Sequence, residues 1–408
     1  MLAASGSASL QRKAAEIWVK EICPPNRSLP TIPWRNHRDK IRIGYFSADF
    51  RVHAVSILTA QLFEIHDRSK FEIIAFSFGP DSDDEMRSRL ERAFDRFIDV
   101  GCKSDREVAL LARSLEIDVA VDLMGFTEHS RPEIFALRAA PLQVSYLGYL
   151  GTMGADYIDY MIADATIVPD RNQERFYEKI MYIPSYQAND SKRRIAERIF
   201  TREELGLPST GFVFCCFNNT YKITPHTFSS WMRILTRAKD SVLFLYAQDA
   251  AAEKNLRAEA GSRGVDANRL VFGKRLPTPE YLARYRAADL FLDTLPYNAG
   301  TTASDALWAG LPVLTCPGEA FAGRVAASLL TAIRMPELIA ATQAEYEELA
   351  VQLAHDPQRL AAIKLKLAAN RLTTPLFDTP QFTRNLEAAF SRIYERYLSG
   401  LPPADVVV

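Results

Sequence analysis

A stretch of small and polar residues near position 300 has the composition of an anion-binding loop. Residues 297–312 read Tyr-Asn-Ala-Gly-Thr-Thr-Ala-Ser-Asp-Ala-Leu-Trp-Ala-Gly-Leu-Pro and follow an apolar run that is typical of a buried strand. Gly300 lets a ligand approach the backbone, and Thr301 and Thr302 place hydroxyls beside the N–H groups of a helix start, where anions are stabilised. Asp305, about one turn later, can reach a sugar hydroxyl. The alternative for these residues in isolation is a simple helix cap.

A second polar loop follows the strand expected at residues 212–217. It begins Asn-Asn-Thr-Tyr-Lys and places Asn218, Asn219 and Lys222 just past the carboxyl end of that strand. Ligands of parallel α/β sheets bind at these strand ends, so we expect this loop and the Gly300 loop to face the same crevice. A preorganised lysine there can neutralise the charge that develops on a leaving diphosphate. A surface lysine in front of a helix is the alternative for this motif alone.

The first half of the chain offers a histidine and two glycine-containing loops. His53, one of six histidines, follows the strand expected at residues 41–46. With an ordinary pKa of about 6.5, an imidazole there can act as a base or orient an acceptor hydroxyl, although many loop histidines are plain surface residues. Residues 125–127 (Gly-Phe-Thr) and 147–154 (Leu-Gly-Tyr-Leu-Gly-Thr-Met-Gly) also follow expected strands. Their glycines let the backbone approach a sugar, although such segments are commonly only turns.

Other chemistries lack support in the sequence. Neither G-x-G-x-x-G nor G-x-x-x-x-G-K-[ST] occurs, which argues against a dehydrogenase or a P-loop ATPase. Asp81-Ser-Asp83 follows a strand, as the metal-binding D-x-D of some sugar transferases does, but it continues as Asp84-Glu85 into a charged helix. Acidic residues are favoured at such a solvated helix start. We therefore predict no metal site.

Apolar runs alternate with helical patterns and predict an α/β fold with two doubly wound, mainly parallel sheets. In the first half we expect strands at 41–46, 71–77, 97–100, 118–123 and 142–147, with helices at 56–65, 81–96, 104–115 and 131–138. In the second half we expect strands at 212–217, 242–246, 270–272, 290–292 and 312–315. Two Rossmann-like lobes that face each other across a cleft would result.

Polar and Pro-rich segments divide the chain into four parts. Residues 1–39 hold an amphipathic helix at 10–22 and a Pro-rich linker, and residues 40–195 form the N-terminal lobe, on the acceptor and sugar side. Residues 196–375 form the C-terminal, nucleotide-binding lobe, and residues 376–408 a helix and tail. A helix start at 201–205 stops at Gly206-Leu-Pro208. The last helix, at 381–398, has no strand to return to and is expected to pack back across the first lobe.

The overall composition is that of a soluble protein with two domains. The 408 residues are 48% hydrophobic and carry a net charge of −1, so the sequence predicts no nucleic-acid partner and no membrane. No stretch has the length and apolarity of a membrane span or an export signal. The five cysteines are odd in number and form no C-x-x-C pair, which favours reduced thiols and a cytoplasmic location.

Six ordered blocks together resemble the family of O-linked N-acetylglucosamine transferases and SPINDLY proteins, in its bacterial type with few or no tetratricopeptide repeats. The resemblance runs from about residue 42 to 398. The blocks are residues 44–50 with His53, 135–144, 147–152, 217–222, 300–308 and 324–330. The resemblance implies a GT-B-like fold and an inverting, metal-independent glycosyltransferase. It would use no cofactor and would move a sugar, foremost GlcNAc from UDP-GlcNAc, to Ser or Thr hydroxyls of a protein.

The resemblance also implies roles for individual residues. Lys222 would contact the diphosphate and Asp305 the ribose, and His53 matches a cleft histidine whose role as base is open. The other donor-binding positions are Gly300, Thr301 and Thr302 at the phosphates, Asn219, Tyr281 and Arg284 near the nucleotide, and Thr127, Leu147, Gly148 and Tyr149 along the sugar.

Some positions depart from the pattern of the family. Tyr281 and Gly300 stand where many bacterial members have histidine, and residues 148–151 read Gly-Tyr-Leu-Gly in place of Gly-Tyr-Pro-Gly. A glycine before the two threonines is also a feature of the SPINDLY branch, which resembles fucosyltransferases that use a GDP-sugar. The alternatives are therefore the same fold with GDP-fucose, another donor or a small acceptor, and a catalytically silent protein that binds nucleotide sugars. The sequence does not fix the oligomeric state.

Overall fold

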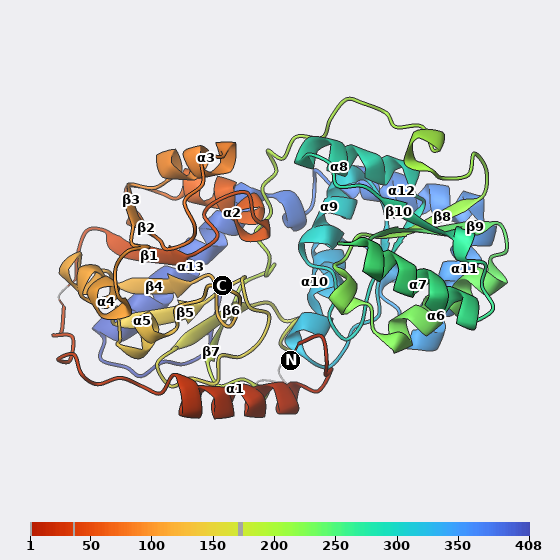
Figure 1. Cartoon of the computed structure of the whole chain (residues 1–408). Helices are drawn as coiled ribbons and strands as arrows, with labels where there is room; N and C mark the ends of the chain where they lie inside the picture. Colours follow the sequence, from red (N-terminus) through yellow and green to blue (C-terminus); the bar gives the residue numbers. More distant parts are fainter. Residues whose placement is uncertain (1, 36, 170–173) are drawn as a thin grey trace. The chain divides into compact units, whose positions relative to one another are not determined.

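The chain forms two compact α/β units (Figure 1). The computed structural model describes residues 2–35, 37–169 and 174–408, so residues 1, 36 and 170–173 of the first two predicted domains lie outside the described residues. We call Ser7–Ser191 with Pro375–Val408 the N-terminal lobe. Lys192–Thr374, with the short segment that ends at Gly6, is the C-terminal lobe. Each lobe is built on one parallel sheet, which confirms the predicted pair of Rossmann-like units.

The sheet of the N-terminal lobe has eight parallel strands in the order β13-β7-β6-β5-β4-β1-β2-β3. Because helices cover both faces, the central strands are buried on both sides and are apolar almost throughout. The order reverses between β1 and β4, and ligands of such sheets bind at the carboxyl ends of the strands at this point. The strands are β1 Ile41–Ser47, β2 Phe71–Ser77, β3 Arg96–Asp99, β4 Val119–Asp122, β5 Leu142–Ser145, β6 Tyr160–Ala163, β7 Lys179–Tyr182 and β13 Val406–Val407.

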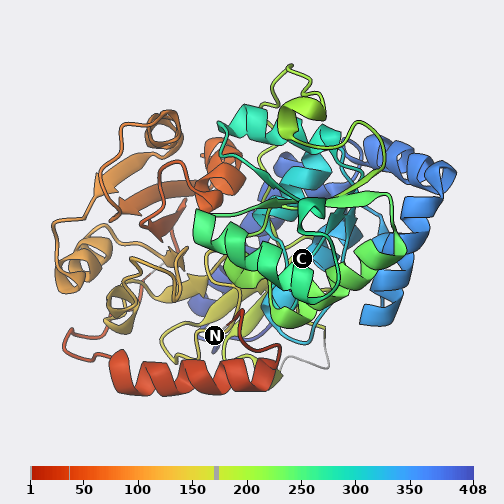
Figure 2. The ribbon, with the colours of Figure 1, turned by 45° about the vertical axis from the view of Figure 1, so that its right-hand side comes forward.

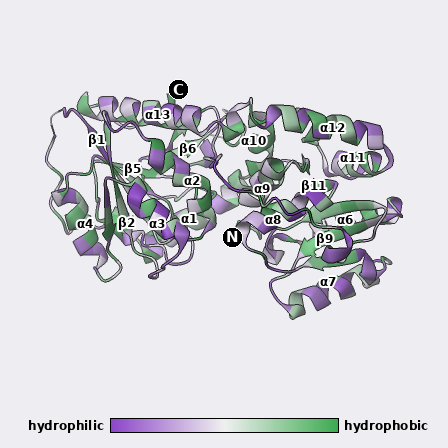
Figure 3. Ribbon diagram, turned by 90° about the horizontal axis from the view of Figure 1, so that it is seen from above, coloured by the Kyte–Doolittle hydropathy of each residue, from purple (hydrophilic) through white to green (hydrophobic). Residues whose placement is uncertain are grey.

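The helices of this lobe form two layers. α2 packs against α3 and against the C-terminal helix α13, while α4 and α5 pack together and share a hydrophobic core with α1. α13 crosses behind the strands in Figure 1, and its hydrophobic and hydrophilic residues alternate in Figure 3, as expected of a helix with one buried face. The prediction that the last helix packs on the first lobe is thus confirmed. The helices are α1 Ala8–Ile22, α2 Ala54–Ile65, α3 Glu85–Ala93, α4 Asp105–Ser114, α5 Glu133–Ala136 and α13 Thr379–Leu398.

Several predicted elements differ from the structure, in this lobe and before the first strand of the C-terminal lobe. β6 and β7 were not predicted, and β13 pairs with β7, so the last helix does have a strand after it. α3 begins only at Glu85 because the side chain of Asp84 caps it by accepting a hydrogen bond from the Arg87 N–H. α5 is a single turn, and the helix expected at 201–205 is only a 3₁₀ turn, η2 (Glu203–Leu205). These segments are too short to show a clear period.

The C-terminal lobe has five parallel strands in the order β10-β9-β8-β11-β12, with helices on both sides of the sheet (Figure 2). The strands are β8 Phe212–Cys216, β9 Ser241–Tyr246, β10 Leu270–Gly273, β11 Leu290–Leu292 and β12 Val313–Leu314. The helices are α6 Pro225–Arg237, α7 Ala250–Ser262, α8 Thr278–Arg284, α9 Thr301–Ala309, α10 Val325–Ala332, α11 Gln343–His355 and α12 Pro357–Asn370. The order reverses between β8 and β11, which brings the loops after these two strands to one crevice.

None of the helices in the described part of the chain is long and apolar enough to cross a membrane.

Candidate functional site

The N-terminus of α9 lies at the switch point of the C-terminal lobe. Gly300 precedes the helix with φ −104° and ψ −86°, and no side chain among the described residues caps it. Since glycine has no side chain, the N-cap residue gives the N–H groups of the first turn no acceptor, and helix starts of this kind can hold an anion. The helix ends at Gly310, whose φ of 89° lies in the left-handed region that glycine adopts without strain. The predicted strand, loop and helix are confirmed here.

A chain of hydrogen bonds ties this helix start to the end of β8. The Thr302 hydroxyl donates to Asn218 Oδ1, and Asn218 Nδ2 donates to Thr294 Oγ1 at 2.8 Å. Thr294 Oγ1 in turn donates to the Tyr297 carbonyl at 2.6 Å. Since the Thr302 hydroxyl hydrogen is used within the lobe, the group that Thr302 can offer to an anion is its backbone N–H.

Lys222 lies at the end of η3 (Thr220–Lys222), directly after β8. Its Nζ donates to the Asn298 carbonyl at 3.0 Å and lies 3.7 Å from the centroid of the Tyr297 ring. Burial lowers the pKa of Lys222 to about 8, against the opposing effect of the Asp293 carboxylate. The ammonium group is therefore mostly charged at neutral pH, next to the start of α9.

Asp305 forms a buried ion pair. Its Oδ1 accepts a hydrogen bond from Arg193 Nη1 at 2.6 Å, and Arg193 Nη2 donates to Ser304 Oγ at 3.0 Å. Burial raises the pKa of Asp305 to about 6, although Arg193 and Tyr281 act in the opposite direction. Trp308 Nε1 donates to the Arg193 carbonyl at 3.0 Å. The resemblance implies a ribose contact for the Asp305 carboxylate. In the structure this carboxylate is paired with Arg193, a cation of the same lobe.

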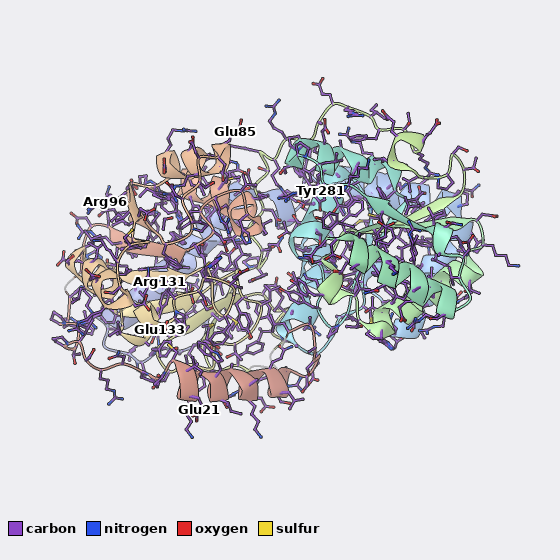
Figure 4. The ribbon with its side chains drawn as sticks, viewed as in Figure 1. Glu21, Glu85, Arg96, Arg131, Glu133 and Tyr281 are labelled. Atoms are coloured by element: carbon purple, nitrogen blue, oxygen red, sulfur yellow. The ribbon has the colours of Figure 1, made fainter. Side chains whose placement is uncertain are left out.

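Tyr281 (labelled in Figure 4) and Arg284 share the short helix α8. The Tyr281 hydroxyl bonds the Tyr285 hydroxyl at 2.6 Å, and the Arg284 guanidinium lies 4.8 Å from the Tyr281 ring and 4.0 Å from the Phe217 ring. Arg284 donates to the Lys274 carbonyl at 2.7 Å, and its buried Nε has no hydrogen-bond partner among the described residues. The half-buried Tyr281 thus offers an aromatic face, and the unused donor of Arg284 is enclosed by protein.

His53 caps α2 in the N-terminal lobe. Its Nδ1 lies 3.2 Å from Asp49 Oδ2 and 3.4 Å from the N–H of Val55. Burial lowers the pKa of His53 and raises that of Asp49, and the two groups oppose these shifts in each other. The cap needs Nδ1 without a hydrogen, whereas a bond to Asp49 needs the hydrogen on Nδ1. Only the second tautomer, which gives up the cap, leaves Nε2 of a neutral imidazole able to accept a proton.

The loops after β4 and β5 come together in the same lobe. The Tyr149 ring meets the Phe126 ring edge-on at 5.2 Å, and the Thr127 hydroxyl donates to the Met124 carbonyl at 2.9 Å. Leu147 has a positive φ of 66°, and a side chain at Gly148 would lie 1.8 Å from the Leu123 carbonyl oxygen. Glycine is therefore required at 148 by packing alone. Burial raises the pKa of Tyr149 to about 12, so its phenol is neutral.

Comparison with known proteins decides the family. The model named glycosyl transferase family 41 matches residues 30–195 and 187–386, nearly the whole chain. The chain belongs to glycosyl transferase family 41.

Three proteins that resemble the chain are named as peptide N-acetylglucosaminyltransferases. The chain is 36% identical over 371 residues to a probable UDP-N-acetylglucosamine–peptide N-acetylglucosaminyltransferase, SEC, of Arabidopsis thaliana, a match that covers 89% of the chain and 38% of the relative. It is 28% identical to the corresponding transferase of Caenorhabditis elegans, with 89% and 41% covered, and 29% identical to a SPINDLY protein of Petunia hybrida, with 91% and 41% covered. The chain thus spans about two fifths of the length of these relatives.

Solved structures agree with the fold. An O-GlcNAc transferase mutant of Thermobaculum terrenum superimposes with a TM-score of 0.88 at 31% identity, over 97% of this chain and 75% of that one. HepE of Anabaena, in complex with UDP and glucose, superimposes with a TM-score of 0.55 at 14% identity, over 86% of this chain and 100% of that one, and shows the fold alone. These comparisons confirm the family and the GT-B fold that the sequence resemblance implied.

The predicted family 41 site residues fall into one group in each lobe. The C-terminal lobe brings together Asn219, Lys222, Tyr281, Arg284, Gly300, Thr301, Thr302 and Asp305, at or after the ends of β8, β10 and β11. The N-terminal lobe brings together His53, Thr127, Leu147, Gly148 and Tyr149, after β1, β4 and β5. Their roles toward a ligand stay predictions.

Sequence reasoning missed the partners of these residues. Arg193 lies two residues before the end of the predicted N-terminal lobe and was given no role, and Asn218 was noted only as a neighbour of Asn219 and Lys222. Asp49 and Asp293 are buried and contact the predicted residues or their loops. For Asp293 there was a signal, because an ionisable residue within an apolar run is rarely buried without a partner.

Proposed function

We propose that this chain is the catalytic region of an inverting, metal-independent glycosyltransferase that moves GlcNAc from UDP-GlcNAc to Ser or Thr hydroxyls of a protein. The observation that carries the proposal is the charged Lys222 beside the α9 N-terminus, which no side chain of the described chain caps, in a member of family 41. A cation next to free N–H groups suits a leaving diphosphate. The names of the relatives from Arabidopsis and Caenorhabditis support UDP-N-acetylglucosamine as donor and a peptide as acceptor.

The residues of the C-terminal lobe would hold the nucleotide. Lys222 and the N–H groups of Thr301 and Thr302 would contact the diphosphate. Gly300 has no side chain, so the diphosphate can approach these groups closely. The nucleoside would lie against Tyr281 and near Asn219 and Arg284, with Asp305 on the ribose. Aromatic faces of this kind stack well on planar rings.

The residues of the N-terminal lobe would serve the sugar and the acceptor. Thr127 and the loop from Leu147 to Tyr149 would line the sugar. The acceptor oxygen attacks the anomeric carbon, the bond from that carbon to the diphosphate breaks with inversion, and UDP leaves. His53, in the tautomer whose Nδ1–H faces Asp49 Oδ2 at 3.2 Å, would take the hydroxyl proton on Nε2.

Binding of UDP and GDP tests the donor. In titration calorimetry with the full chain, we expect UDP to bind more tightly than GDP. Gly300 gives the alternative its specific basis, because a glycine before the two threonines is also a feature of the SPINDLY branch. Tighter binding of GDP would favour a GDP-sugar donor, and binding of neither nucleotide would contradict a site for either nucleotide sugar.

Transfer should not depend on a divalent ion. Across the described residues, no group of three or more His, Cys, Asp or Glu side chains is placed to hold one, and Lys222 with the α9 N–H groups supplies positive charge at the proposed phosphate position. We expect equal rates of UDP release from UDP-GlcNAc before and after dialysis against EDTA. A strict and saturable requirement for Mg²⁺ or Mn²⁺ would contradict this and bring Asp81 and Asp83 back into consideration.

Cellular location and partners follow from the proposal. A nucleotide sugar and a protein acceptor are the partners, with neither nucleic acid nor membrane involved. All five cysteines are free thiols, and four of them are buried, which supports a reducing compartment such as the cytoplasm.

A further inference from the structure

A single peptide unit joins the proposed phosphate-binding lysine to a buried carboxylate. The peptide between Asn298 and Ala299 accepts a hydrogen bond from Lys222 Nζ through its carbonyl, at 3.0 Å. Its N–H, contributed by Ala299, donates to Asp293 Oδ1 at 2.7 Å. Lys222 and Asp293 therefore act on opposite ends of the same dipole. A carboxylate on the N–H polarises the peptide and makes its carbonyl a better acceptor for an ammonium group.

Asp293 is held rigidly in place. Besides the Ala299 N–H, its Oδ1 accepts the Thr294 N–H at 2.8 Å, and its Oδ2 accepts the Thr315 hydroxyl at 2.7 Å. The residue is only 4% exposed. The carboxylate thus holds both ends of the loop between β11 and α9. Lys222 donates its hydrogen bond to a carbonyl of the same loop.

The carboxylate is charged at neutral pH. Burial raises its pKa to about 6, with the three hydrogen bonds and Lys222 acting to lower it. The other ionisable groups that act electrostatically with these two are Cys216, Cys316 and Tyr346, and burial raises the pKa of each of the three. Among the described residues, Asp293 is therefore the source of negative charge near Lys222 at pH 7.

We propose that Asp293 is a positioning residue for catalysis, which keeps Lys222 charged and in place through the Asn298–Ala299 peptide. This inference rests on the proposed function, because it gives Lys222 its task at a diphosphate. Asp293 itself lies behind the loop and has its carboxylate oxygens occupied by groups of this lobe. It acts on the reaction only through the lysine.

The test compares Asp293→Asn with the parent chain. Asparagine keeps the shape and an acceptor for the Ala299 N–H but removes the charge. We expect the pKa of Lys222 to fall by about one pH unit, the lower end of the range for loss of a nearby opposite charge. NMR of the Lys222 Cε and Nζ measures this pKa, and the Lys222→Arg variant assigns the signals. UDP affinity at pH 8 should then fall roughly fivefold, because a pKa lower by about one unit reduces the charged fraction of the lysine by that factor.

A matched control separates the charge from the fold. Thr315→Val removes one hydrogen bond to Asp293 but leaves the carboxylate, so the pKa of Lys222 should not fall. The folded-state pKa of Asp293 lies above its unfolded value, so its ionisation opposes folding as the pH rises from about 4 toward 6. Asp293→Asn should accordingly melt no lower than the parent at pH 8, whereas a purely structural role would lower the melting temperature.

Two outcomes would overturn the inference, and a third concerns the proposed function alone. An unchanged titration of Lys222 in Asp293→Asn contradicts it. In the parent chain, the Lys222 signals should also shift near pH 6 as Asp293 takes up a proton, and the absence of that step contradicts it even where the variant does not fold. A shifted Lys222 pKa with no UDP binding by the parent would support the pairing and refute the nucleotide site.

Discussion

Lys222→Ala should lower turnover by about 10²- to 10³-fold while the fold stays intact, the scale on which removal of one preorganised charge-stabilising donor acts. The lysine lies against the Tyr297 ring and on the Asn298 carbonyl, so its cation is in place before the substrate arrives. It would neutralise charge that grows on the diphosphate as the bond to the sugar breaks. The loss should appear mainly in kcat, because that charge is largest in the transition state.

The measurement is UDP release from UDP-GlcNAc, followed together with a melting curve for each variant. Lys254→Ala on α7 is the matched control, since Lys254 is an exposed lysine of the same lobe. It should keep full activity. Normal turnover of Lys222→Ala, with an unchanged melting temperature, would remove Lys222 from the mechanism.

The central strands could be predicted because burial on both faces makes them continuous apolar runs. β1, β2 and β11 begin and end within a residue of the expected bounds. β6 and β7 have four residues each and follow the glycine-rich loop after β5, where no helical pattern separates them. β13 consists of two residues that become a strand only because β7 offers an unpaired edge. Such pairing is a tertiary effect and leaves no periodic signal.

The candidate site could be predicted as a set of residue types on loops, but not as a set of contacts. Lys222 and Thr302 stand at strand ends, which the α/β pattern places at one crevice. The sequence does not say that a carbonyl 76 positions from Lys222 receives its hydrogen bond, or that Asn218 takes the hydroxyl hydrogen of Thr302. These pairings depend on how the loops after β8 and β11 fold against each other.

Asp305 shows the same limit. Its distance from Thr301 along α9 suggested a sugar contact, yet its Oδ1 accepts a hydrogen bond from Arg193, a residue of the segment before the lobe's first strand. With side-chain exposures of 4% for Arg193 and 9% for Asp305, the pair is buried.

Arg193→Ala should destabilise the C-terminal lobe by about 3 to 5 kcal/mol, the usual cost of leaving one member of a buried ion pair without its partner. The variant also loses the hydrogen bond to Ser304 Oγ. Urea unfolding followed by tryptophan fluorescence measures the change, since Trp308 contacts Arg193 directly. Asp305→Asn in the same background should recover part of the loss, because no charge is then left unpaired.

The loss should depend on pH in a defined direction. Asp305 already has a pKa near 6 with Arg193 present, and removal of the cation raises it further. A carboxyl whose folded-state pKa lies above its unfolded value opposes folding once the pH passes the unfolded value, so the variant should be weakest at pH 8 and recover toward pH 5 as the buried group takes up a proton. The double variant lacks this carboxyl and should not show that recovery. A loss of equal size at both pH values would mean that packing, and not the unpaired charge, accounts for the destabilisation.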